Sequence, residues 1–142
     1  MFTGSQLQTG NKDIGSSVDE NRRSLRAKWG TTVIEEGWTP VPVRLLNGQH
    51  KLGIKPSEMT VLLHLLKHWF NADDEYVFPR QARIAGASGM SVRTVQRSID
   101  SLEHKGLISK EKKQSEGSIY QHNHYSLAPL VKKVQALDLT EA

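Results

Sequence analysis

Polar side chains that can bond nucleic-acid bases cluster near the start of one amphipathic segment, residues 91–104. At 100° per residue, a helix through this segment has one apolar face and one polar face. The apolar face carries Val92, Val95, Ile99 and Leu102, and the polar face carries Arg93, Thr94, Arg97, Asp100, Ser101 and His104. An arginine can donate paired hydrogen bonds to O6 and N7 of guanine, and Gln96, at the flank, can reach adenine. The pattern predicts a helix that reads double-stranded DNA in the major groove.

The residues before this helix predict a tight turn between two helices. Ser91 is a natural N-cap, and with the positive end of the helix it favours a phosphate contact. Gly89 is the residue expected where the backbone must turn with a positive φ. A short helix over residues 80–87 precedes the turn. Its first residues, Arg80 and Gln81, would lie where this partner helix crosses the DNA backbone.

Past Gly106, which should end the helix, the hydrophobic period becomes alternating and predicts a β-hairpin. Its strands lie in residues 107–113 and 118–127 around a turn-forming segment, residues 114–117. The hairpin side chains that can contact DNA are Lys110, Lys112, Lys113, His122 and Asn123, with Gln121 and His124 beside them. Alternation puts the three lysines on two faces, so they share one partner only if the hairpin tip enters the nucleic acid.

Upstream residues should supply the core. A helix over residues 56–70 carries apolar residues at three- and four-residue spacing on more than one side, which is typical of a core helix. Residues 29–43 are apolar but contain two prolines, which favours an extended segment lying across that core. A short helix over residues 43–51 and a last amphipathic helix from Pro129 complete the elements.

This order of elements is a helix-turn-helix followed by a hairpin wing. Residues 53–131 resemble the bacterial winged helix-turn-helix domains of small transcriptional regulators and of plasmid and phage replication proteins. The resemblance is carried by Phe78-Pro79-Arg80-Gln81, Ile84-Ala85, Gly89 to Arg97 (GMSVRTVQR), Leu102 to Ile108 (LEHKGLI) and Tyr125-Ser126-Leu127. It implies a mainly α fold with a small β-hairpin wing, and DNA binding. Arg80 departs from the family pattern, which has a serine cap there, and residues 86–89 are more flexible than the usual charged turn.

Composition divides the chain into three parts. Residues 1–28 have too few apolar residues for a core and are predicted to be a disordered polar tail. Its basic end, residues 21–28, is either an arm that reaches phosphates or simply solvated charge. Residues 29–128 are predicted to form the winged helix-turn-helix domain with its extended N-terminal segment, and residues 129–142 a C-terminal amphipathic helix and tail.

The net charge of +4 is distributed unevenly along the chain. Residues 80–133 hold ten Lys/Arg and four Asp/Glu, whereas residues 1–79 hold nine of each. The basic excess therefore belongs to the predicted DNA-binding half, as the electrostatics of phosphate binding require.

Several classes of chemistry find no support in the sequence. The absence of cysteine excludes disulfides, a thiolate nucleophile and thiolate metal sites. His64 and His68 have a spacing that can chelate zinc, as does the pair His122 and His124, but neither pair has a third ligand nearby. No phosphate loop or nucleophile motif is present, and no apolar run approaches about 18 residues. We expect no metal, no cofactor, no catalysis and no membrane span, and a cytoplasmic protein.

Three functions remain open from the sequence. The first is a sequence-specific transcriptional regulator. The second is a replication initiator or partition factor of a plasmid or phage, and the third is a protein-interaction adaptor that does not bind DNA. A homodimer is expected, because two half-sites give the affinity that one small module seldom reaches. Its contact would be the C-terminal helix or the segment of Trp29 and Trp38, unless these residues complete the core.

Overall fold

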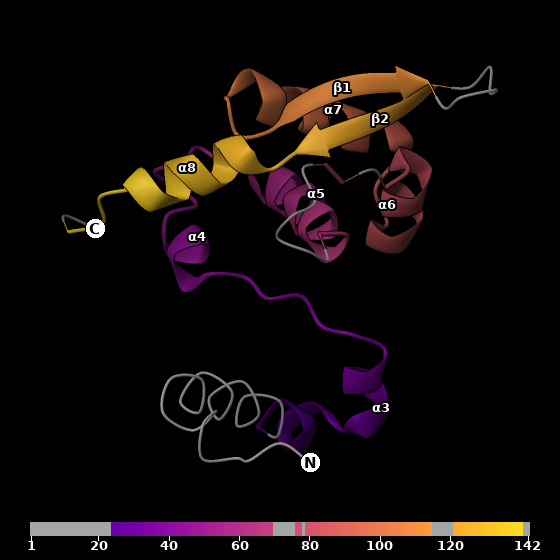
Figure 1. The fold of residues 1–142 in the computed structure, drawn as a ribbon, viewed down its shortest axis with the longest axis vertical. Coiled ribbons are helices and arrows are strands. Elements are labelled where there is room, and N and C mark those ends of the chain that lie inside the picture. The colour runs from indigo at the N-terminus through magenta and orange to yellow at the C-terminus, as the bar shows by residue number, and fades with distance from the viewer. Residues whose placement is uncertain (1–23, 70–75, 78, 115–120, 141–142) are drawn as a thin grey trace, which may run out of the picture. The chain divides into compact units, whose positions relative to one another are not determined.

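The computed structural model describes residues 24–69, 76–77, 79–114 and 121–140. The chain divides into two compact units, residues 1–38 and 39–142. The second unit contains α4 (Val43–Asn47), α5 (Pro56–Lys67), α6 (Gln81–Ser88), α7 (Val92–His104), β1 (Ser109–Gln114), β2 (Gln121–Ser126) and α8 (Ala128–Ala136) (Figure 1). This order confirms the mainly helical fold with a two-stranded antiparallel hairpin. The helix expected to reach Phe70 ends at Lys67, and Phe70 lies outside the described residues.

The first unit differs from the expectation of tail and extended segment. Residues 24–29 are helical where the sequence predicted disorder, since most of them are good helix formers. Instead of an extended stretch, residues 31–35 form α3 (Thr31–Glu35), after Gly30 with a φ of 87°. The indoles of Trp29 and Trp38 are 62% and 48% exposed, so neither residue belongs to the buried core. Residues 1–23, including most of the predicted tail, lie outside the described residues.

The core of the second unit forms where α5 packs against α7, with α6 packed against both. Helix α5 is buried on more than one side, as predicted, because Val61, Leu62 and Leu65 are all fully buried. The fully buried side chains from the other elements are Leu45, Ile84, Val95, Ile99, Leu102, Leu107, Ile108 and Tyr125. The amphipathic α7 thus has its position set by its apolar face, and its polar face is left to solvent.

Strands β1 and β2 pair in a register that runs from Ser109 opposite Ser126 to Gln114 opposite Gln121. Val77 adds a two-bond bridge to Tyr125, with N–H to O distances between the two backbones of 2.8 and 2.7 Å. The predicted turn lies mostly outside the described residues, since residues 115–120 are not described. We call the β1–β2 hairpin the wing.

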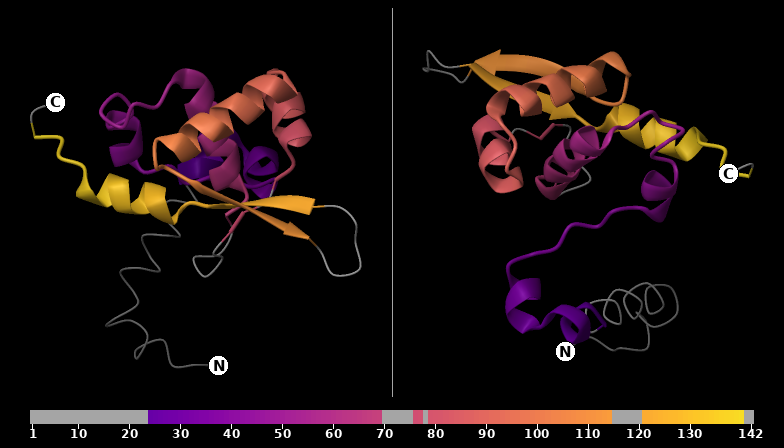
Figure 2. Two further views of the ribbon diagram at one scale, coloured as in Figure 1. Left: turned by 90° about the horizontal axis from the view of Figure 1, so that it is seen from above. Right: turned by 180° about the vertical axis from the view of Figure 1, so that it is seen from behind.

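Helix α8 continues directly from β2, away from the end that faces the hairpin turn (Figure 2). Its Leu130 is buried in the core, and Val134 packs on that core. At its end, Arg44 Nη1 donates to the carbonyl of Leu137 over 3.0 Å, and the Leu137 side chain lies against Gly48. The apolar side of α8 is therefore used within its own unit.

Candidate nucleic-acid interface

The turn between α6 and α7 has the geometry that the sequence predicts. Gly89 adopts a left-handed conformation, with φ 76° and ψ 9°, and its N–H donates to Ala85 O over 3.0 Å. Ser91 is the N-cap of α7, because its Oγ accepts from the Thr94 N–H at 3.0 Å. The Ser91 hydroxyl also donates to Thr94 Oγ1 at 3.0 Å. Both hydroxyls thus hold the first turn of α7 in place while Ser91 itself remains exposed.

Three polar side chains of α7 are exposed in its first two turns: Arg93, Gln96 and Arg97. We call these the recognition face. The opposite face is buried through Val95, Ser98, Ile99 and Leu102. No ion pair links either arginine to another residue in the described ranges, so both guanidinium groups keep their donors for a partner.

The assignment of Val92 to the buried face is wrong. Its side chain is 48% exposed, although the helical period places it nearest to the buried residues. The physical reason is its place at the edge of the buried arc, where its helical neighbours Gln96 and Glu103 are exposed as well.

At the start of α6, the two predicted phosphate contacts have different surroundings. Arg80 is the N-cap residue, makes no side-chain capping bond and is exposed. Gln81 is half-buried, and its Nε2 donates to the hydroxyl of Tyr125 over 3.3 Å. Gln81 therefore joins the start of α6 to the buried base of the wing, a contact between residues 44 positions apart that no local pattern reveals.

Lys110 in β1 is engaged by α7. Its Nζ lies 3.0 Å from Asp100 Oδ1, and its backbone N–H donates to Glu103 Oε2 over 3.0 Å. The hydrogen bond to Asp100 raises the pKa of Lys110 above its ordinary value, and so keeps the ammonium charged. This lysine, predicted to face DNA, thus fastens the wing to the helix that carries the recognition face.

The remaining wing residues pair along the two strands. Lys112 stands opposite Asn123, and Lys113 stands opposite His122. Asn123 is half-buried. For Lys112, Lys113 and His122 the structure describes the strand pairing alone, and their contact with DNA stays a prediction.

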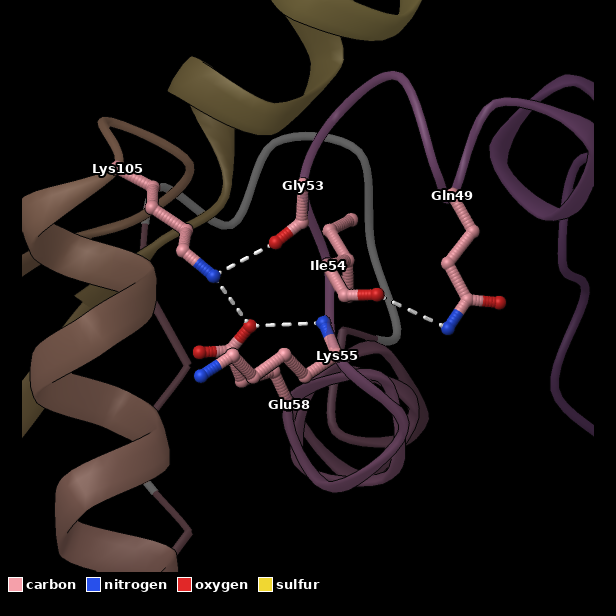
Figure 3. A network of polar contacts seen from close by, with 6 residues as sticks. All are labelled: Gln49, Gly53, Ile54, Lys55, Glu58 and Lys105. Atoms are coloured by element: carbon pink, nitrogen blue, oxygen red, sulfur yellow. Dashed lines mark hydrogen bonds and ion pairs between the residues drawn. The ribbon is translucent and has the colours of Figure 1, made fainter.

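A buried carboxylate whose distant partner was not predicted from the sequence joins α5 to the end of α7 (Figure 3). Glu58 is 3% exposed, and its Oε1 accepts from Lys105 Nζ at 2.7 Å and from the Lys55 N–H at 2.8 Å. The same ammonium donates to Gly53 O over 2.6 Å. Burial alone would raise the pKa of Glu58, but the hydrogen bonds from Lys105, Ser101 and the Lys55 N–H outweigh it and lower that pKa.

The two histidine pairs whose spacing could suit zinc were not predicted to bind a metal. In the part of the chain that the structure describes, no group of three or more His, Asp or Glu side chains is arranged to hold an ion. Burial lowers the pKa of His64 and of His68, and the charge of Lys67 lowers both further. Within the same ranges, no helix has both the length and the apolar character needed to cross a bilayer.

Comparison with known families agrees with this geometry. Residues 52–108, from the turn before α5 to the start of β1, match the family model described as a helix-turn-helix domain. No curated protein matches the chain significantly. The matched range contains the Gly89 turn, the capped α7 and the recognition face, and the wing follows it directly. Residues 52–108 therefore match a helix-turn-helix domain, and the hairpin that follows is consistent with the winged form of that fold.

Proposed function

We propose that this protein binds a specific site on double-stranded DNA and regulates transcription, with α7 in the major groove and the wing on the backbone or minor groove. The observation that carries the proposal is the recognition face. Arg93, Gln96 and Arg97 project from the first two turns of α7, and the opposite face of that helix is buried against the core through Val95, Ser98, Ile99 and Leu102. Helix-turn-helix domains present the N-terminal residues of this helix to base edges.

Electrostatics support the same orientation. From residue 80 to residue 99 the chain carries four arginines and no acidic residue. Arg80, Arg83, Arg93 and Arg97 are all exposed, two at the start of α6 and two on α7. A surface of one charge sign attracts the phosphate backbone, and neutralised phosphates release counterions.

The test is selection of bound fragments from random DNA with the full-length protein, followed by affinity measurements over a range of salt concentrations. We expect one recurring sequence, bound about tenfold more weakly for each doubling of salt if four phosphates are neutralised. Recovery of no preferred sequence, with affinity insensitive to salt, would refute the proposal and favour the adaptor. Tandem direct repeats would favour the replication or partition role, and an inverted repeat the regulator.

The proposal includes a homodimer, and the free surfaces favour one of its two predicted contacts. The apolar side of α8 is occupied within its own unit, whereas the Trp29 and Trp38 side chains are exposed. We therefore propose the Trp29/Trp38 segment as the dimer contact. Paired half-sites in the recovered DNA, about one helical turn or a multiple apart, would support it.

Releasing Lys110 from α7 is expected to strengthen non-specific DNA binding. In the variant Asp100→Asn the ammonium loses its carboxylate partner and becomes available to a phosphate. We expect the plot of log affinity against log salt to steepen by about one phosphate contact. Stability should change by less than about 1 kcal/mol, because Asp100 is more than half exposed. Anisotropy titrations on unrelated DNA at several salt concentrations measure the slope.

A matched control is Glu36→Gln, which removes the same charge from an exposed residue of the first unit. It should leave the slope unchanged. Equal slopes for Asp100→Asn and the unmodified protein would mean that Lys110 does not reach a phosphate even when released.

A further inference from the structure

Val92 is exposed at a place where folding gives no reason for an apolar side chain. The other large exposed apolar residues are Trp29, Val33, Trp38, Val43 and Leu46, and all precede the helix-turn-helix domain. Within the described part of residues 52–108, Val92 is the one with such exposure, at 48%. It is the first residue of α7 and borders the recognition face at Gln96, which lies four residues on and so one helical turn away on the same side.

The position of Val92 on the helix is well defined. Ser91 caps the helix, so the backbone of Val92 is held by the bond from the Thr94 N–H to Ser91 Oγ. A β-branched side chain in a helix strongly prefers one χ1 rotamer, so its methyl groups form a nearly rigid apolar surface. Such a surface loses little conformational entropy when it contacts a partner.

Val92 also lies on the same side of α7 as the wing. Four- and eight-residue steps along the helix lead from Val92 to Gln96 and then to Asp100. Asp100 bonds to Lys110 of β1, so this line of residues runs along the wing side of the helix. Arg93 lies three residues before Gln96 and Arg97 three residues before Asp100, so the arginines flank this line of residues and Val92 stands at its N-terminal end.

In the major groove, one base edge presents an apolar group. Thymine carries a 5-methyl group there, whereas the other groups read in that groove are hydrogen-bond donors and acceptors. We infer that Val92 contacts the 5-methyl group of a thymine and so specifies that base next to the one read by Arg93. This inference rests on the proposed function, because it requires α7 to lie in the major groove.

Deoxyuridine provides the test, since it pairs as thymine does and lacks only the 5-methyl group. Each thymine of the selected site is replaced in turn, and the full-length protein and Val92→Ala are titrated against each duplex. For the unmodified protein, one thymine position of each half-site should be sensitive. A single replacement at that position should weaken binding about fourfold, the effect expected for one buried methyl group. For Val92→Ala the same replacement should have no effect. Val92→Ile, which keeps an apolar side chain, should retain the loss.

The control variant is Val43→Ala, which shortens an exposed valine outside the helix-turn-helix domain and should keep the deoxyuridine profile of the unmodified protein. The inference is overturned if every thymine can be replaced without loss, or if the loss persists in Val92→Ala. If either result were found while binding to the selected DNA site still required Arg93 and Arg97, the inference about Val92 would fail and the proposed function would stand. Failure to select any site would overturn both.

Discussion

The variant Lys105→Met is expected to lower the free energy of unfolding by about 3 kcal/mol at pH 7, because it leaves the Glu58 carboxylate buried without its cationic partner. The Lys55 N–H remains as a donor to that carboxylate, which keeps the loss near the low end for a broken buried pair. Methionine preserves most of the apolar stem, so the loss reports on the charge. Urea unfolding followed by circular dichroism measures it.

The effect of Lys105→Met should depend on pH. In the unmodified protein the pKa of Glu58 is lowered, so this group contributes stability above its unfolded pKa and the contribution disappears as pH falls through the folded pKa. Without Lys105, burial raises that pKa instead. The difference in stability between the two proteins should therefore be full well above the raised pKa of Glu58 in the variant. It should shrink as pH falls through that pKa and be lost below the lowered pKa of Glu58 in the unmodified protein.

Two further variants separate charge from packing. Lys132→Met removes an exposed lysine of α8 and should cost little. The double variant Glu58→Gln with Lys105→Met removes the buried charge together with its partner and should recover part of the stability. If Lys105→Met were no more destabilising than Lys132→Met, the ion pair would have no structural role.

The double variant Arg93→Ala with Arg97→Ala is expected to bind the selected DNA site at least about thirtyfold more weakly, since each base-contacting arginine contributes about 1 to 3 kcal/mol. Discrimination between this site and unrelated DNA should fall as well. Stability should change little, because both side chains are exposed and make no ion pair within the described ranges. Anisotropy titrations on both DNAs, with a thermal melt of each protein, separate these effects.

Lysine substitutions sharpen that experiment. Arg93→Lys with Arg97→Lys keeps the charge but loses the paired donors that recognise guanine, so non-specific affinity should persist while discrimination falls. Lys132→Ala is the control for removal of a basic side chain elsewhere. Unchanged discrimination in both double variants would show that α7 does not read base edges through these residues.

Local signals predicted the elements that position the interface. Gly89 and Ser91 act on their own backbone or on the next three residues, so their effects can be read from neighbouring sequence. Gly106 is similar: with a φ of 71° it ends α7, and the Leu107 N–H donates back to Leu102 O over 2.9 Å. The order of the helices and the hairpin can be predicted from such turn, capping and helix-ending residues.

Contacts between distant residues could not be predicted in the same way. Glu58 and Lys105 are 47 positions apart, and neither has a local feature that names the other. Asp100 looked like a polar-face residue and Lys110 like a DNA contact until the packing of β1 on α7 brought them together. Val92 shows a different limit of sequence analysis. The helical period of 100° per residue gives the direction of its side chain but does not say how far around α7 the buried surface extends.

Tyr125 lies where the wing is attached to the rest of its unit. Its backbone bridges Val77, its hydroxyl accepts from Gln81, and the strand residue opposite it, Lys110, is bonded to α7. These described attachments all lie near the base of the hairpin, within its first two residue pairs from Ser109 and Ser126. The next pair, Glu111 and His124, adds an edge-on contact between the His124 ring and the Tyr76 ring, whose centroids lie 6.1 Å apart. Strand pairs nearer the turn than this one can therefore be lengthened, shortened or exchanged between proteins without altering these contacts. The length of the wing is thereby a property that sequence changes can alter independently of its attachment to α6 and α7.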